Sequence, residues 1–278
     1  TDNFAIVPQN WDAGQETFSA TNAMGTGPFK ITLREPNTKT VFKKNGKWWG
    51  NVEHNITEIQ LLPIKNAATR VAALLSGEID LVTDAPVQDL NRISSSGGHK
   101  VESTPQMRTI FLGMDQKADK LRTGNTGDNP FKKKEVRQAL YQAIDIEAIK
   151  KKVMRGLSEP AGIITFPGVT GYTKALDKRL PYDVDAAKKL LADAGYPNGF
   201  DVELRCPNDR YVNDEAICTA VVGMLGKIGV NVNLFAQTKS KHFKELKDNQ
   251  GDFYMLGWGV PTLDSHYVFH YLYETGAS

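Results

Sequence analysis

The sequence has little of three features that often identify a class of protein: long apolar runs, cysteine, and an excess of one charge. Its 278 residues contain no run near the roughly 20 apolar residues that cross a bilayer, so we predict no membrane-spanning helix. Its 2 cysteines are too few for a disulfide scaffold. Because 34 basic and 32 acidic residues leave a net charge of only +2, we expect no nucleic acid among the partners.

Signature motifs of catalysis are also missing. The sequence has no GxSxG elbow, HExxH helix, CxxC pair or phosphate-binding loop. His266 and His270 have the spacing of one helix face, but no cysteine or carboxylate at ligand spacing completes a metal site. Hydrolase and nucleotide chemistry therefore lack their usual signals, and we expect no cofactor and no metal. A hydrolase with a carboxylate pair is the alternative from another class, although such pairs arise by chance among 32 acids.

The composition that is present is typical of a globular protein, with 40% hydrophobic and 24% charged residues. Near the start, Phe29, Ile31 and Leu33 alternate as in a half-buried strand. Asn66 then has the character of an N-cap for a helix over 67–76. The serine- and glycine-rich stretch 91–99 predicts a linker after this first block.

The second half predicts α/β architecture. Apolar residues recur at helical spacing after Lys134 and again over 185–194. A repeated βαβαβ pattern follows, which predicts parallel strands. Its expected strands are 200–204, 230–234 and 253–256, and its expected helices are 214–228 and 241–248.

Three loops should meet at the carboxyl edge of these parallel strands, where ligands bind in open α/β sheets. They are 206–213, 237–240 and 257–266. Taken together, the first and third loops carry one arginine, acids and aromatic side chains, which can orient a polar organic ligand. The alternative is that Arg210 pairs with a neighbouring acid, Asp209 or Asp214, on the surface.

The two cysteines, Cys206 and Cys218, have eleven residues between them. They could form a disulfide in an oxidising compartment or stay as small buried residues. The two cysteines therefore do not indicate in which cellular compartment the protein works.

Several segments, in order along the chain, resemble the large extracytoplasmic solute-binding proteins of peptide and nickel ABC importers, bacterial solute-binding protein family 5. The segments are GTGPFKI, NGKWWGN, AALLSGEIDLV, NPFKKKEVRQALYQAIDIEAIKKKVMRG, DVDAAKKLLADAGYPNGF and GMLGKIGVNV. The most specific combination is VRQALYQAID with KKLLADAGY and the late GWG. The resemblance implies a receptor and not an enzyme, which closes on a ligand and delivers it to a membrane permease.

The same resemblance implies a two-lobed fold of the periplasmic-binding-protein type, of which one lobe is nearly complete. Residues 1–105 would be part of lobe I, and 106–278 would be lobe II, incomplete at its C-terminal end. The family's N-terminal part and C-terminal tail would be missing. The protein would work in the periplasm, or outside the cell at the membrane, with the permease subunits of the transporter as partners.

The resemblance also implies site residues. In the dipeptide receptors an arginine grips the ligand carboxylate, and Arg210, followed by Tyr211, matches it. The position of their amine-binding aspartate holds Pro261, so Asp264 could substitute only if the loop bends differently. The expected ligand-binding set is Arg210, Tyr211, Trp258, Gly259, Asp264 and His266. Because GWGVPTLDSH is also similar to the motif of the nickel receptors, a peptide, a metal chelate and another small polar solute all stay open as ligands.

Overall fold

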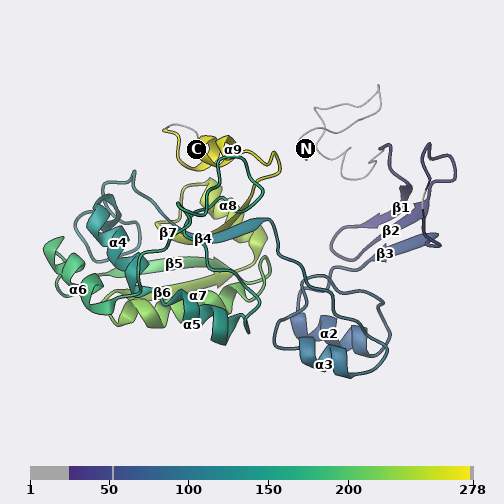
Figure 1. The fold of residues 1–278 in the computed structure, drawn as a ribbon, viewed down its shortest axis with the longest axis horizontal. Coiled ribbons are helices and arrows are strands. Elements are labelled where there is room, and N and C mark those ends of the chain that lie inside the picture. The colour runs from purple at the N-terminus through teal and green to yellow at the C-terminus, as the bar shows by residue number, and fades with distance from the viewer. Residues whose placement is uncertain (1–24, 52, 276–278) are drawn as a thin grey trace. The chain divides into compact units, whose positions relative to one another are not determined.

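A computed structural model describes residues 25–51 and 53–275 of the chain (Figure 1). Contacts divide the chain into two compact units, Thr1–Thr69 and Arg70–Ser278. No helix in the described part of the chain combines the length and the apolar character that crossing a membrane would take. The loops predicted to bind a ligand all belong to the second unit.

The first unit contains a three-stranded antiparallel sheet in the order β1-β2-β3. Its strands are β1 Phe29–Glu35, β2 Lys39–Lys44 and β3 Glu58–Leu61. The strand predicted from the alternation at Phe29 is therefore confirmed. Asn37, with a φ of 62°, turns the chain from β1 into β2, because asparagine tolerates the left-handed region better than most residues.

Helix α2, Ala67–Leu75, begins where the sequence predicted. The side-chain oxygen of Asn66 accepts a hydrogen bond from the backbone N–H of Thr69 at 3.0 Å, which satisfies one of the free donors of the first turn. The N-cap prediction at Asn66 is confirmed. Gly77, with a φ of 77°, follows the end of this helix, as a C-terminal glycine commonly does.

The prediction of a linker over 91–99 is wrong for its first half, where helix α3, Leu90–Ser95, is formed. The helix is stabilised by Ile93, which is buried against Val71 and Leu74 in a small apolar cluster. A single buried isoleucine among serines gives too weak a periodic signal to be read from the sequence.

The second unit is built on a four-stranded mixed sheet in the order β4-β7-β5-β6. Its strands are β4 Arg108–Met114, β5 Asp201–Pro207, β6 Asn231–Gln237 and β7 Phe253–Gly259. The last three are parallel, as predicted, and β4 pairs with β7 in the antiparallel sense. The predicted α/β fold class is confirmed for this unit.

Helices cover both sides of this sheet. The connecting helices α7 Asp214–Gly226 and α8 Lys239–Lys247 lie on opposite sides of it (Figure 1). The other helical segments are η1 Pro130–Lys132, α4 Lys134–Ala143, α5 Ile146–Ala148, η2 Ile149–Val153, α6 Val184–Asp193 and α9 His266–Leu272. The largest fully buried side chains of the shared core include Phe131, Leu140, Leu204, Leu225 and Phe253.

Cys206 and Cys218 form a disulfide that joins β5 to α7, with their Cα atoms 6.6 Å apart. Both residues are fully buried in the core and lie next to the sulfur of Met255. The sequence left open a disulfide or two separate buried cysteines, and the structure has the disulfide. The bond ties the strand that precedes the Arg210 loop to the helix that follows it.

Candidate functional site

The carboxyl edge of the parallel strands is uneven, and this shapes the site. β5 and β6 end together, because Pro207 pairs with Gln237. β7 continues farther, since Tyr254 pairs with Arg205 and the strand ends only at Gly259. The last residues of β7 therefore extend beyond the end of β5, where the loop that follows β5 can contact them.

The loop after β5 is organised by the buried carboxylate of Asp214. Its Oδ2 accepts hydrogen bonds from the backbone N–H groups of Arg210 and Tyr211, both at 2.9 Å. Asp209 accepts a hydrogen bond from the N–H of Lys239. Both acids that could have paired with the Arg210 guanidinium are thus used by backbone groups. Within the described chain, Arg210 makes no ion pair, so the alternative of a surface pair with either neighbour is not realised.

Tyr211 joins this loop to β7. Its hydroxyl accepts a hydrogen bond from the N–H of Gly257 at 2.8 Å. A Cβ atom at Gly257 would lie 2.7 Å from the Tyr211 ring, so only glycine allows this close approach. Burial raises the pKa of Tyr211, although the nearby charges of Arg210 and Arg108 act in the opposite direction. The hydroxyl therefore stays protonated at neutral pH.

Arg108 is a site residue that the sequence reasoning missed. It begins β4 and pairs across the sheet with Gly259. Its guanidinium carbon lies 5.9 Å from the centroid of the Tyr211 ring, and that of Arg210 lies 5.2 Å from the same centroid. Nothing local in the sequence around Arg108 showed that its strand starts at the carboxyl edge of the parallel strands.

Trp258 lies beside this cluster on β7 and belongs to a second aromatic group. Its ring packs against Tyr267 and Tyr271 of α9, with both centroids 5.9 Å away. The indole N–H is buried, and none of the residues that the structure describes accepts a hydrogen bond from it. Trp258 is thus half-buried beneath α9, and its ring forms part of the wall that supports the edge.

Asp264 and His266, both exposed, lie together on the other side of Trp258. Asp264 accepts a hydrogen bond from the N–H of His266, and the His266 ring stacks on that of His270 with centroids 5.8 Å apart. A pocket of about 370 Å³ is lined by Thr262, Asp264, His266, Tyr267, His270 and Tyr271. The six predicted residues therefore form two neighbouring groups, with Arg210, Tyr211, Trp258 and Gly259 at the edge and Asp264 and His266 at this pocket. Within the described residues, no three side chains of the metal-binding types gather at one point.

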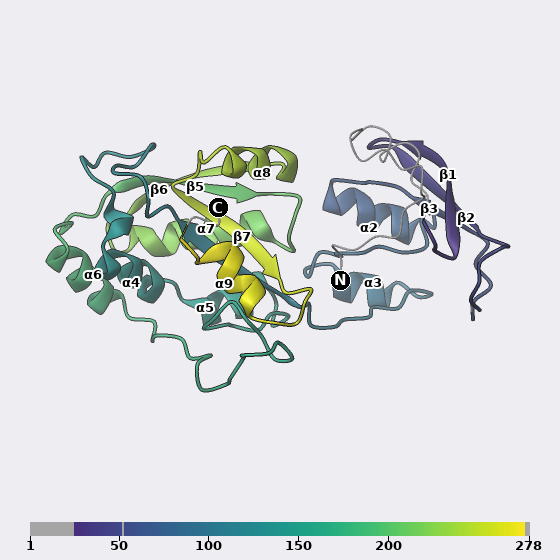
Figure 2. The same ribbon diagram turned by 90° about the horizontal axis from the view of Figure 1, so that it is seen from above.

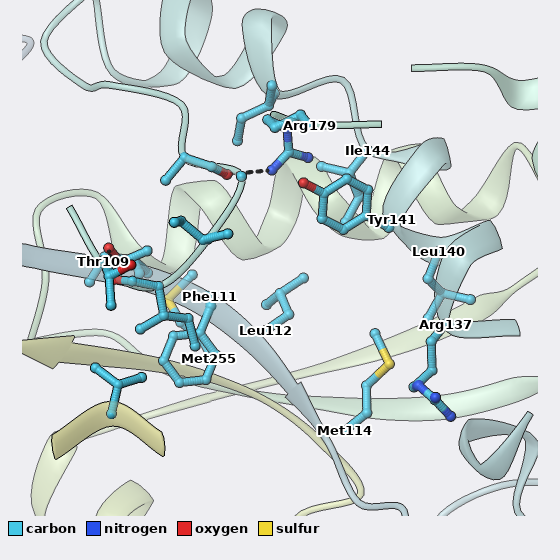
Figure 3. A pocket seen from close by; sticks show the side chains of 18 of the residues that line it. Thr109, Phe111, Leu112, Met114, Arg137, Leu140, Tyr141, Ile144, Arg179 and Met255 are labelled. Atoms are coloured by element: carbon cyan, nitrogen blue, oxygen red, sulfur yellow. Dashed lines mark hydrogen bonds between the residues drawn. The ribbon is translucent and has the colours of Figure 1, made fainter. Parts of the chain in front are cut away.

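A larger cavity of about 480 Å³ lies between β4, α4, α7 and α9 (Figure 3). It is lined mainly by aliphatic and aromatic side chains, including Phe111, Leu112 and Leu140, and by none of the six predicted residues. Arg179 on its wall stacks on Tyr141 at 4.3 Å and donates to the carbonyl of Ala161, the dashed line in Figure 3. Since the guanidinium of Arg179 is already engaged, this apolar cavity is a poor site for a polar solute.

Comparison with known proteins gives a consistent family. A sequence model of the bacterial extracellular solute-binding proteins, family 5, matches residues 3–278. Heme-binding protein A of Haemophilus influenzae is 26% identical over 253 residues, which cover 88% of this chain and 43% of that protein. The dipeptide-binding protein of Escherichia coli is 25% identical over 260 residues, covering 92% and 46%.

Solved structures agree on the fold. The periplasmic binding protein DppA of Helicobacter pylori, in complex with the peptide STSA, superposes with a TM-score of 0.74 and 26% identity. The match covers 85% of this chain and 43% of that one. The chain thus spans about half the length of the relatives that it matches.

Proposed function

Because the chain belongs to family 5 of the bacterial extracellular solute-binding proteins, we propose that its protein is the substrate-binding component of an ABC importer. It would bind a peptide or a similar small polar solute and deliver it to a membrane permease. Similarity to a dipeptide-binding protein and to a receptor solved with a peptide supports the choice of ligand class. The function requires no catalysis, and its place would be the periplasm.

The observation that carries the proposal is the Arg210 guanidinium, which lies at the carboxyl edge of the sheet and pairs with no carboxylate among the described residues. Such a half-buried arginine can form a bidentate ion pair with a ligand carboxylate. Asp214 fixes its backbone, and Tyr211 fixes the loop against β7. The arginine therefore does not need to be reorganised before a ligand binds, which lowers the entropic cost of binding.

Two features of the proposal concern the whole protein. We assign residues 1–105 to one lobe and 106–278 to the other, with Arg210, Tyr211, Trp258, Gly259, Asp264 and His266 as the ligand-binding contribution of the second. Asp264 and His266 line a pocket at the start of α9 whose lining does not include Tyr211, so they would meet a different part of the ligand.

The test is isothermal titration calorimetry on the full-length protein with small peptides and with their C-terminal amides. The wild type should bind a free-acid peptide about tenfold more tightly than its amide, because a charged hydrogen bond is lost. Arg210→Gln should lose this difference, since the group that reads the carboxylate is gone. Lys188→Gln, which removes one positive charge on the exposed face of α6, should keep it.

An absence of binding with every peptide would overturn the proposal. If a metal chelate bound instead, and Arg210→Gln weakened that binding, the ligand would be a chelate held by the same arginine. Equal affinity for acid and amide in the wild type would contradict the role of Arg210.

A further inference from the structure

Two guanidinium groups share one aromatic ring at the ligand edge. The guanidinium carbons of Arg108 and Arg210 lie 5.9 and 5.2 Å from the centroid of Tyr211. Arg108 comes from the start of β4, and Arg210 from the loop after β5, so the fold brings together two cations that are far apart in sequence. Each guanidinium carbon lies within 6 Å of the same ring centroid, so the two carbons are at most about 11 Å apart, and an anion near both groups would be attracted by both charges.

Within the described chain, neither guanidinium is neutralised. Several other arginines of this unit are engaged: Arg122 and Arg205 contact carboxylates, and Arg137 and Arg179 donate to backbone carbonyls. Among the described residues, the guanidinium groups of Arg108 and Arg210 have neither kind of partner and contact only the Tyr211 ring, although both side chains are partly withdrawn from solvent. Because partial burial weakens screening by water, the pair creates a local positive field that attracts an anion.

The cross-strand neighbour of Arg108 is a glycine. Gly259 pairs with Arg108, and partner side chains lie on the same face of a sheet. Gly259 contributes no side chain there, and a Cβ atom at this position would lie 3.2 Å from the carbonyl oxygen of Met107. Tyr211, held to β7 through Gly257, keeps the ring that both cations contact at a fixed position.

We infer that Arg108 and Arg210 form a two-cation site for the end of a solute that carries two negative charges, as in a peptide whose C-terminal residue is acidic. Arg210 would bind the α-carboxylate, and Arg108 the side-chain carboxylate. The inference rests on the proposed function and specifies its ligand class. It makes Arg108 a residue that determines specificity, while Arg210 supports binding of peptides in general.

The experiment compares Ala-Ala-Glu with Ala-Ala-Gln by titration calorimetry on the full-length protein. These peptides have nearly the same shape and differ by one negative charge. The wild type should bind the glutamate peptide about tenfold more tightly, as expected for one charged hydrogen-bond pair. Arg108→Gln should remove the preference, so that Ala-Ala-Glu and Ala-Ala-Gln bind with equal affinity. Arg108→Lys should keep part of it, because the charge remains but the planar fork is lost.

Lys188→Gln is the matched control for the loss of one positive charge and should retain the full preference. Equal binding of both peptides to the wild type would overturn the inference, and so would an undiminished preference in Arg108→Gln. In those two results peptides still bind, so the proposed function stands. If neither peptide binds the wild type, the proposed function and the inference fail together.

Discussion

The hydroxyl of Tyr211 accepts a hydrogen bond from the backbone N–H of Gly257 at 2.8 Å, and this contact ties the loop after β5 to the last strand of the sheet. Gly257 belongs to the part of β7 that runs past the end of β5. Its N–H has no strand partner on that side, and the tyrosine takes the place of one. One side chain thus bonds to the exposed edge of β7 and also fixes the ring that the guanidinium groups of Arg108 and Arg210 contact.

Tyr211→Phe removes the acceptor and leaves the ring. The N–H of Gly257 would lose its partner in a half-buried position, which costs about 1–2 kcal/mol of unfolding free energy. Because the loop is then less firmly held, peptide affinity should fall severalfold as well. Urea unfolding followed by circular dichroism, with calorimetry on the same samples, measures both effects. Unchanged stability together with unchanged affinity would show that the hydrogen bond does not hold the loop.

Gly257→Ala tests the close approach itself. A Cβ atom there would lie 2.6 Å from Cδ1 of Ile110 and 2.7 Å from the Tyr211 ring, so one of them must move. We expect a loss of about 1–3 kcal/mol in unfolding free energy, and weaker ligand binding because the ring is displaced. Gly223→Ala is the control: it lies in α7 with nothing within 4 Å, and alanine is the better helix former. It should be neutral or slightly stabilising by urea unfolding.

Much of the second unit could be predicted because its signals are local. Alternating apolar residues bounded by glycines mark the three parallel strands. In the first unit, Asn66 likewise accepts a hydrogen bond from the backbone at the helix start where its sequence position predicted a cap. The direction of each connection then follows from chain topology. The position of Arg210 at the ligand edge was therefore accessible from the sequence.

Arg108 was not accessible in the same way. Its place at the edge depends on the antiparallel pairing of β4 with β7, which aligns Arg108 with Gly259 across about half of the chain. No local pattern encodes a partner at that distance. The hydrogen bond from Gly257 to Tyr211 could not be predicted for the same reason, because it depends on how far β7 extends beyond the end of β5. The sequence therefore predicted that the Arg210 loop lies at the carboxyl edge of the parallel strands, but not that Arg108 lies beside the same tyrosine ring.

The disulfide between Cys206 and Cys218 should contribute to stability, because it closes a short loop in the unfolded chain. For a loop of this size the chain-entropy model gives about 3 kcal/mol. Protein from an oxidising compartment, denatured without reductant, should show no free thiol by thiol titration, and two after reduction. The double variant Cys206→Ala with Cys218→Ala should unfold at lower urea concentration. Two free thiols before reduction would contradict the bond.

His242 should make the protein less stable as the pH falls. The ring is fully buried, and Nε2 lies 2.9 Å from the carbonyl oxygen of Met255, so the neutral ring donates there. Burial lowers the pKa of His242 below its ordinary 6.5, and the positive charge of Arg205 also lowers it. The Met255 carbonyl and Glu245 act in the opposite direction. Asp214 is the other charged group that acts on it, and it also favours the protonated ring.

Acid should lower the unfolding free energy because the unfolded chain takes up a proton that the native state does not. Below pH 6.5 the unfolded chain protonates this histidine while the native state keeps it neutral, so acid favours unfolding by up to about 1.4 kcal/mol per pH unit until the lowered native pKa is reached. Urea unfolding at pH 7.5 and pH 5.5 should show this loss in the wild type. His242→Gln should lose less stability between the two values, because glutamine does not titrate, whereas His54→Gln, at an exposed position of the first unit, should behave as the wild type does. An equal acid-side loss in His242→Gln would assign the pH dependence to other groups, since the substituted residue no longer takes up a proton.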